Sequence, residues 1–373
     1  MIRVRHLLKG LGPGGAERLV VAQATAPGSI EHDVVYLIPE KRHLVPLLEA
    51  AGVSSRCLDA PSAARPGWIR RLHRMLRADP VDVLHVHSPA LAAVARIVVR
   101  TLPSDVRPVV VSTEHNRWPR HHRVTRLGNR LTIRLQAATI AVSDDVRSTV
   151  RGVAADRVTV VVHGIDIVAV RSSADGARVR DELGIDSTDV VVVCVANLRR
   201  EKALDVLIAA AAQALDEEAR LRYLLVGQGP LADDVDRWIA AAGVGERFTA
   251  LGYRADATRI ISAGDILTLS SAHEGLPVAV MEALALGLPI VATAAGGIPA
   301  AAGTAGLISA VGDAEALAAN HLEMARDEPR RRELALAAKL EAQRFELSRA
   351  VSEIEEIYAA AIDGTGVADN SHS

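Results

Sequence analysis

The 373-residue chain has few cysteines, little net charge and no long apolar run, and each shortage excludes a class of protein. Cys57 and Cys194 lie far apart without metal-ligand spacing, which excludes a disulfide framework and indicates a reducing compartment. The formal net charge of -2 gives no general attraction to nucleic acid. No stretch of about 20 apolar residues is free of proline, glycine and charge, so we expect no membrane-spanning helix. The first residues form a strand pattern without a secretory leader, so we expect a cytoplasmic protein.

Apolar runs of strand length alternate with helical stretches, which is typical of parallel sheets covered by helices on both faces. The runs form two successive sets, so the pattern predicts two doubly wound α/β domains. The first set comprises residues 34–38, 83–87, 108–113, 138–142 and 158–162, and the second comprises 190–196, 223–226, 266–269 and 290–292.

A short polar stretch over residues 171–176 lacks periodicity and predicts the linker between the two domains. The first domain is therefore expected over 1–170 and the second over 177–345. A last helix is expected over 348–361. Residues 363–373 are rich in glycine, asparagine and serine, and we expect them to be disordered.

Two carboxylates eight residues apart, Glu274 and Glu282, stand in an almost wholly apolar segment. Carboxylates placed there must find hydrogen-bond donors or suffer a large desolvation penalty, so the segment predicts a polar ligand. The alternative is that each glutamate caps a helix or pairs with an arginine.

The residues around Glu274 predict a strand, a loop and then a helix that begins near Pro277. The free amides of Gly275, Leu276 and Val278 then gather at the start of the helix, where partial positive charge favours a phosphate group. Glu274 stands beside that position and Glu282 lies about one and a half turns into the helix. Both carboxylates can therefore face one ligand.

The loop from Gly10 to Gly15 matches the glycine fingerprint of dinucleotide-binding proteins. That fingerprint also needs an acidic residue at the end of the second strand, and Glu40 follows Pro39 at a longer spacing than usual. A NAD-dependent oxidoreductase or an epimerase is therefore one alternative. A tight turn without a ligand is another.

Short motifs recur in one order from Gly14 to Tyr358. They are Gly14–Glu17, Thr113–Asn116, Ile140–Ser143, His163–Asp166, Val195–Lys202, Leu225–Pro230, Leu251–Arg254 and the pair Glu274 and Glu282. This order resembles the retaining glycosyltransferases of family 4, which have the GT-B fold and an E-x7-E signature.

The resemblance implies two Rossmann-like domains that face a central cleft: an N-terminal acceptor domain, joined by the C-terminal helix, and a C-terminal donor domain for a nucleotide sugar. It also implies transfer of a hexose from a nucleotide diphosphate sugar to an acceptor hydroxyl, with retained anomeric configuration, in the synthesis of a polysaccharide, glycolipid or cell-envelope glycan. A non-catalytic module that binds nucleotide sugars shares the same donor motifs and stays open.

Within the second domain, the resemblance implies that Lys202 and an arginine hold the diphosphate and stabilise its growing charge. Ala196 and Asn197 stand where the family commonly has Gly-Arg, so the arginine role passes to Arg199 or Arg200. Glu282 is expected to bind the ribose hydroxyls. Glu274 is expected to bind the hydroxyls of the sugar.

Within the first domain, the resemblance implies that His115, just past a strand end, contacts the donor sugar and positions the reacting centre. Gly14 and Gly15 are expected to admit the donor phosphate or the acceptor near Glu17. No metal or other cofactor is expected, because helix termini and cations neutralise the charge that a divalent ion would otherwise neutralise.

Two further histidines, His85 and His87, alternate on one strand and so face one side of it, which suggests a metal site. No cysteine, aspartate or glutamate completes a ligand set nearby in the sequence. We therefore expect a structural role for both.

The segment over 117–134 carries six arginines interleaved with apolar residues. Such a basic, partly amphipathic segment is typical of helices that lie on anionic lipid headgroups. It predicts a peripheral enzyme on the inner membrane face and a lipid-linked acceptor. A solvated arginine-rich helix beside a sugar or small-molecule acceptor is the alternative.

Overall fold

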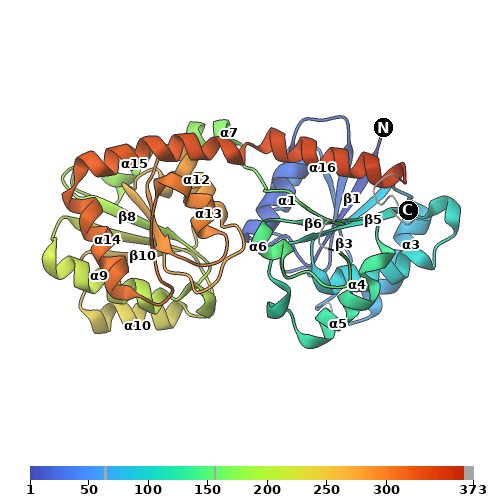
Figure 1. The fold of residues 1–373 in the computed structure, drawn as a ribbon, viewed down its shortest axis with the longest axis horizontal. Helices are drawn as coiled ribbons and strands as arrows, with labels where there is room; N and C mark the ends of the chain where they lie inside the picture. The colour runs from blue at the N-terminus through green and yellow to red at the C-terminus, as the bar shows by residue number, and fades with distance from the viewer. Residues whose placement is uncertain (63–64, 155–156, 365–373) are drawn as a thin grey trace, which may run out of the picture. The chain divides into compact units, whose positions relative to one another are not determined.

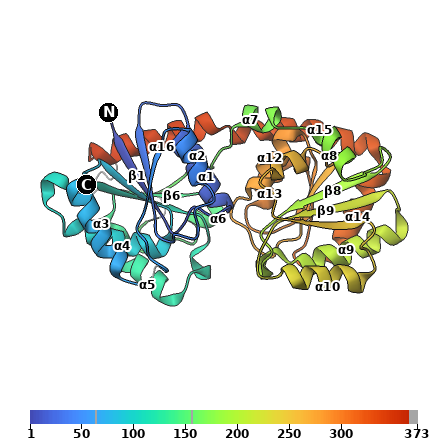
Figure 2. The same ribbon diagram turned by 180° about the vertical axis from the view of Figure 1, so that it is seen from behind.

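The computed structural model describes residues 1–62, 65–154 and 157–364. The chain divides into two compact units (Figures 1 and 2): unit 1 comprises Met1–Gly164 and Leu347–Ser373, and unit 2 comprises Ile165–Glu346. Most of the tail expected over 363–373 lies outside the described residues.

Unit 1 contains a seven-stranded sheet in the order β3-β2-β1-β4-β5-β6-β7, with every neighbouring pair parallel. Its strands are β1 Arg3–Leu8, β2 Glu31–Tyr36, β3 Ser54–Cys57, β4 Val83–Val86, β5 Val109–Glu114, β6 Ala138–Ala141 and β7 Val158–Val160. The central strands are buried on both faces, which explains their near-continuous apolar runs. β3 is a short edge strand whose residues alternate in exposure, and the sequence pattern missed it.

Helices cover both faces of this sheet, and β5 illustrates the division. Val110 packs with the core residues of α3 and α4, whereas Val111, next along the strand, packs with those of α16. Figure 1 shows α16 and α1 on the same side of unit 1, and these two helices contact each other. The helices of unit 1 are α1 Gly15–Thr25, α2 Val45–Ala50, α3 Gly67–Ala78, α4 Pro89–Arg100, α5 Arg123–Thr132, α6 Asp144–Arg147 and α16 Leu347–Ile362, with single 3-10 turns at Ser104–Val106, Trp118–Arg120 and Ile133–Leu135.

The last helix, α16, completes unit 1 because it fills one face of the sheet. Ala350, Ile354 and Tyr358 lie in one buried cluster with strand residues of β1, β4, β5 and β6. The Tyr358 hydroxyl also lies 2.6 Å from Nδ1 of His85 and accepts a hydrogen bond of 2.9 Å from Gln23 on α1. The sheet of unit 1 is therefore covered by residues from both ends of the chain.

Unit 2 contains a six-stranded parallel sheet in the order β10-β9-β8-β11-β12-β13. Its strands are β8 Val190–Val195, β9 Leu221–Val226, β10 Phe248–Gly252, β11 Ile266–Leu269, β12 Ile290–Thr293 and β13 Gly306–Ser309. The predicted fold class, two doubly wound Rossmann-like units, is thus confirmed.

The helices of unit 2 lie in two groups on either side of its sheet (Figures 1 and 2). They are α7 Ile167–Ser172, α8 Gly176–Glu182, α9 Leu204–Glu217, α10 Ala232–Ala242, α11 Ala257–Ile261, α12 Val278–Leu286, α13 Ile298–Ala302, α14 Ala314–Arg326 and α15 Glu328–Glu341, with 3-10 turns at Arg200–Lys202, Gly303–Ala305 and Ala342–Phe345. α9, α10 and α14 pack together, as do α7, α12 and α15. Across the described residues, no helix is both long and apolar enough to span a bilayer.

The chain enters unit 2 at Ile165, earlier than the expected linker over 171–176. That stretch instead contains the end of α7 and the start of α8. Arg171 anchors it, because its Nε donates a 2.9 Å hydrogen bond to the carbonyl of Ala285 on α12. A polar stretch without periodicity was mistaken for a linker because the partner that orders it lies more than 100 residues away.

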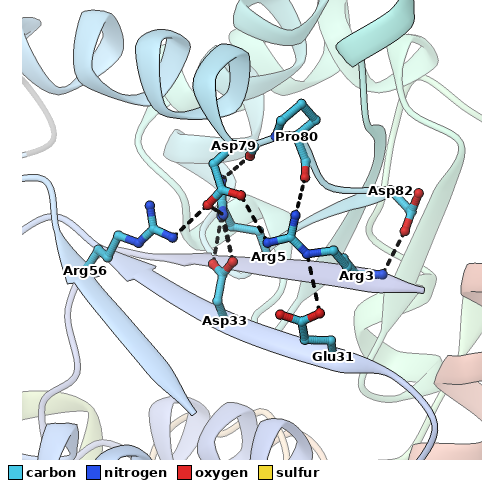
Figure 3. A network of polar contacts seen from close by, with 8 residues as sticks. All are labelled: Arg3, Arg5, Glu31, Asp33, Arg56, Asp79, Pro80 and Asp82. Atoms are coloured by element: carbon cyan, nitrogen blue, oxygen red, sulfur yellow. Dashed lines mark hydrogen bonds and ion pairs between the residues drawn. The ribbon is translucent and has the colours of Figure 1, made fainter. Parts of the chain in front are cut away.

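An ion network ties the amino ends of the unit 1 strands together (Figure 3). The fully buried Arg5 on β1 donates to both oxygens of Asp33 on β2, at 2.7 Å each, and to Asp79 at 2.8 Å. Arg56 and Arg3 also donate to Asp79 (Figure 3). Burial raises the pKa of Asp79, but these three guanidinium groups outweigh it and hold the pKa well below its usual range. Open α/β sheets bind ligands at the carboxyl ends of their strands, and this network lies toward the amino ends, so we assign it to stability.

We expect Asp33→Ala to lower the free energy of unfolding of unit 1 by about 3–5 kcal/mol, because it leaves the Arg5 charge buried without its bidentate partner. The matched control is Arg3→Ala, whose side chain is 35% exposed and should cost only about 0–1 kcal/mol. Urea unfolding followed by tryptophan fluorescence in a Trp238→Phe background reports on unit 1 alone, because the remaining tryptophans lie there. Equal losses in the two variants would contradict the assignment.

Candidate functional site

In unit 2, a lysine and a glutamate from two different loops meet at the carboxyl edge of the sheet. Lys202 ends the 3-10 turn after β8, and Glu274 lies in the loop after β11. The Lys202 Nζ donates to Oε1 of Glu274 at 2.6 Å, and the Ser271 hydroxyl donates to the same oxygen at 2.6 Å. The Glu274 side chain is only 8% exposed, so this pairing supplies the donors that a carboxylate in an apolar segment needs.

Backbone contacts fix the loops that carry these two residues. The amide of Ala272 donates to the carbonyl of Glu201 at 2.9 Å, and the Ser270 hydroxyl donates to the carbonyl of Lys202 at 2.9 Å. The loop after β12 joins them, because a Cβ at Gly296 would overlap the carbonyl of Glu274. Three strand ends thus form one interlocked edge.

Two helices begin at this edge without a side-chain cap. α9 starts after Ala203, which has the left-handed φ of 45°, and α12 starts after Pro277. Helix starts carry partial positive charge on their amides, and this charge favours an anion. Arg199 and Arg200 are exposed beside α9, and neither forms an ion pair in the described part of the chain. The edge can therefore bind a group with several negative charges.

The structure also places the three predicted amide donors at the start of α12. Gly275 and Leu276 precede Pro277, and Val278 is the first residue of the helix. The amide of Gly297, in the loop after β12, donates to the carbonyl of Gly275 at 3.0 Å and holds this loop in place.

Glu282 has different neighbours from Glu274. It lies on α12, is 8% exposed, and accepts a 3.0 Å hydrogen bond from the hydroxyl of Thr258 on α11. The sequence predicted that both carboxylates face one ligand. In the structure, Glu282 is bound by a side chain of α11, whereas Glu274 is bound by side chains of the loops after β8 and β11. Sequence reasoning missed Thr258, because no motif includes α11.

In unit 1, His115 lies just past the end of β5 between two other histidines. Its ring is stacked on that of His163, with centroids 5.4 Å apart, and lies 5.8 Å from the ring of His87. Burial, with His163 adding to it, lowers the pKa of His115 to about 3, so its imidazole is neutral at neutral pH. A neutral imidazole there can exchange hydrogen bonds with a ligand but cannot serve as a resident cation.

Sequence reasoning missed two members of this histidine group. Ring nitrogens of His6 on β1 lie 3.0 Å from Nε2 of His87 and 3.0 Å from Nδ1 of His32 on β2. His6 pairs in register with His85 on β4, so the two side chains lie on the same face of the sheet. The available signal was the shared alternation of two neighbouring strands, which the pattern of a single strand does not reveal.

His85 binds protein groups through both of its ring nitrogens. They lie 2.6 Å from the Tyr358 hydroxyl and 2.8 Å from the Thr113 hydroxyl. Ring nitrogens of His6, His85 and His87 all lie within 4.8 Å of one another, a spacing suited to a metal ion. Both nitrogens of His6 and of His85 already have protein partners, however, so we interpret the group as a hydrogen-bonded network.

The glycine loop at the start of α1 is closed by its own glutamate. Gly14 precedes the helix without a side-chain cap, and Gly15 begins it. Glu17 folds back so closely that a Cβ at Gly14 would overlap its carboxylate. Burial raises the pKa of Glu17. This loop therefore presents a carboxyl group where the sequence predicted the acceptor side.

Comparisons with known proteins identify the family of this chain. Residues 13–169 match the model described as Glycosyltransferase Family 4, and residues 189–327 match the one described as Glycosyl transferases group 1. The chain is a family 4-like glycosyltransferase. The predicted function, that of a nucleotide-sugar glycosyltransferase of the hexosyltransferase type, is confirmed, and the oxidoreductase or epimerase alternative is not favoured.

Named relatives of this glycosyltransferase support the identification. It is 24% identical to the N-acetyl-alpha-D-glucosaminyl L-malate synthase of Bacillus anthracis, over 77% of each chain. It is 27% identical to the alpha-D-kanosaminyltransferase of Streptomyces kanamyceticus, over 78% of this chain and 80% of that protein. A solved structure of Anabaena Alr3699/HepE with UDP and glucose matches 96% of this chain and 100% of that one, with a TM-score of 0.84 and 22% identity. That likeness supports the GT-B fold.

The buried histidines of this glycosyltransferase predict that unit 1 loses stability in mild acid. Burial lowers the pKa of His32 and His163 to about 4, and that of His115 to about 3. Below the unfolded pKa of about 6.5, the unfolded chain binds protons that the folded one does not, so the free energy of unfolding falls by up to about 1.4 kcal/mol per pH unit for each such ring. Burial raises the pKa of Glu114 to about 7, so protonation of this carboxyl group increases the free energy of unfolding as the pH falls from 7 toward its unfolded pKa. This single group opposes several histidines, so the net effect is a loss of stability.

The measurement is the urea midpoint of unit 1 in the Trp238→Phe background at several pH values from 7.5 to 4.5. We expect a steady fall below pH 6.5. A midpoint that stays level over this range would show that the rings are not held neutral.

Proposed function

We propose that this enzyme transfers a hexose, with retained configuration and without a metal ion, from a nucleoside diphosphate sugar to a hydroxyl of a lipid-linked or glycan acceptor. The observation that carries the proposal is the partly buried Lys202–Glu274 pair beside two uncapped helix starts. A UDP sugar is the first donor to test, because the matched Anabaena structures hold UDP, UDP-glucose, or UDP and glucose.

Without a donor, the Lys202–Glu274 pair keeps the site electrically balanced. A buried charge without a partner is strongly unfavourable, so the lysine and the glutamate neutralise each other. An arriving diphosphate offers Lys202 a second anionic partner and leaves the Glu274 carboxylate free to accept hydrogen bonds from sugar hydroxyls. The same pair therefore serves both halves of the donor.

Departure of the sugar increases the negative charge on the diphosphate. Lys202, the amides at the start of α9 and the nearby Arg199 and Arg200 are arranged to stabilise that charge. Fixed cations and helix termini neutralise the leaving group, so we propose that a divalent ion is not required. Glu282, which keeps the Thr258 hydrogen bond, is assigned to the ribose hydroxyls.

In unit 1, we assign the neutral His115 to the sugar, where it positions the reacting centre through a hydrogen bond. Glu17 and the loop around Gly14 and Gly15 are assigned to the acceptor side. The raised pKa of Glu17 suits a carboxyl group that exchanges hydrogen bonds with an acceptor hydroxyl.

We expect the purified enzyme to release nucleotide from at least one member of a panel of UDP, GDP and ADP sugars, in the presence of a candidate acceptor and of EDTA. Nucleotide release is measured by coupled assay, and the product anomer by NMR. No release from any donor would contradict the proposed function. Release that requires an added divalent ion would contradict the metal-free mechanism alone.

The same assay tests whether Arg199 or Arg200 binds the diphosphate of the donor. We expect Arg199→Ala or Arg200→Ala to raise the KM for the donor about tenfold or more, since a charge-assisted bond to phosphate contributes about 1.5–3 kcal/mol. Both side chains are exposed, so the melting temperature should not change. The matched control is Arg332→Ala, an exposed arginine on α15 paired with Glu328. An unchanged KM in both variants would remove the arginines from the donor site.

The exposed apolar face of α5 supports a second proposal, that the enzyme binds an anionic membrane that contains its acceptor. Val124, Leu127 and Leu131 on α5 are 72%, 59% and 71% exposed, and their spacing of three and four residues places them on one face. The other side of α5 is anchored, because the buried Asn129 bonds to Arg96 of α4.

The charge of the segment supports an anionic partner for this face. The 117–134 segment carries six arginines and no acidic residue, so the residues of the segment that flank its apolar stripe are basic or neutral. That combination fits anionic lipid headgroups better than a neutral partner. Trp118, in the same segment, is only 3% exposed and belongs to the core.

We expect the enzyme to sediment at low salt with vesicles that contain phosphatidylglycerol and not with neutral phosphatidylcholine vesicles. Leu127→Gln with Leu131→Gln should lower this binding about tenfold or more, because two leucines lose their apolar contact. Leu336→Gln with Leu340→Gln on α15 is the matched control, since these leucines are 65% and 69% exposed. An absence of vesicle binding by the wild type at low salt would contradict the membrane contact.

A further inference from the structure

Three histidines form a row at the carboxyl ends of the unit 1 strands. His87 follows β4, His115 follows β5 and His163 follows β7. The rings of His87 and His115 lie 5.8 Å apart, and those of His115 and His163 lie 5.4 Å apart and nearly parallel, at 13°. His87 and His163 are only 9% and 3% exposed.

Each histidine of the row has one buried ring nitrogen without a hydrogen-bond partner among the described residues. These atoms are Nδ1 of His87, Nε2 of His115 and Nε2 of His163. By contrast, His6 and His85, within the strands, have partners for both nitrogens. A buried polar atom without a partner carries its full desolvation penalty, and native proteins keep few of them. Three such atoms in adjacent rings, at the edge of an α/β sheet where ligands bind, indicate a binding site for polar groups.

The chemistry of the row fits hydroxyl groups. A neutral imidazole offers one donor and one acceptor, and its free nitrogen has either role according to the tautomer. A hydroxyl both donates and accepts, so it satisfies the free nitrogen in either case, whereas a phosphate accepts only. Burial, with the nearby Arg349 adding to it, lowers the pKa of His163 to about 4, which keeps this ring neutral at neutral pH.

We propose that His87 and His163 are substrate-binding residues that hold hydroxyl groups of the same sugar that His115 contacts. This inference rests on the proposed function and adds two residues to it. His87 is held in place from within the fold, because its Nε2 is bonded to Nδ1 of His6 at 3.0 Å. His163 is held by its stacking on His115.

Two substitutions of His163 separate binding from a structural role. His163→Phe keeps a flat ring for the stack and removes the nitrogen, and His163→Gln places an amide near the position of Nε2. We expect His163→Phe to lower kcat/KM for the accepted sugar nucleotide about tenfold, with a melting temperature equal to or above that of the wild type. His163→Gln should recover most of the loss. His73→Phe, on α3, is the control and should leave kcat/KM unchanged.

Three outcomes decide the proposal when a donor is turned over. A tenfold loss in His163→Phe with recovery in His163→Gln supports it. An unchanged kcat/KM in His163→Phe overturns it while the proposed function stands. A loss that follows a lowered melting temperature, with no recovery in His163→Gln, indicates a structural role and also overturns it.

If the wild type releases nucleotide from no donor, the proposed function fails, and a direct binding measurement decides the histidine site. The probes are UDP-glucose and UDP, added to protein labelled with ¹³C-histidine, with the His163 resonance assigned from the His163→Phe spectrum. A shift of the His163 resonance with UDP-glucose and not with UDP supports a sugar site. The absence of any shift overturns it.

Discussion

A carboxylate in an apolar segment must be neutralised, and the structure of the unit 2 edge follows from that constraint. Glu274 can be buried only because Lys202 and Ser271 reach the same oxygen. That contact joins the loop after β8 to the loop after β11, and the close approach of Gly296 adds the loop after β12. The edge is therefore organised by one ion pair before any donor is present, and the starts of α9 and α12 remain open beside it.

The two units differ in how they avoid the desolvation penalty of buried polar groups. The candidate site of unit 2 uses formal charges in balance, as in the Lys202–Glu274 pair. The candidate site of unit 1 uses neutral imidazoles, because burial keeps rings such as those of His115 and His163 deprotonated. Under the proposed function, the cations of unit 2 suit a diphosphate, whereas the neutral rings of unit 1 and the Glu274 carboxylate suit the hydroxyls of an uncharged sugar.

Local patterns predicted most of the fold, and contacts between distant segments account for what they missed. Continuous apolar runs identified the buried strands, and Pro277 marked the start of α12. The half-exposed β3 lacks such a run and was missed. The motifs located Lys202 and Glu274 but not the bond between them, which joins residues 72 positions apart. His6 was missed for the same reason, since its partners lie on other strands and only the register of the sheet brings them together.

The placement of α16 affects the order in which the two units can fold during synthesis. Unit 2 is one continuous segment from Ile165 to Glu346, whereas unit 1 needs residues from both ends of the chain. As the polypeptide leaves the ribosome, the sheet of unit 1 emerges first but lacks the helix that covers one of its faces, and His85 lacks the Tyr358 hydroxyl. Unit 2 can then fold before unit 1 is finished, although it is translated later. An incomplete chain consequently leaves the apolar strand residues under α16 exposed to solvent until the last helix is made.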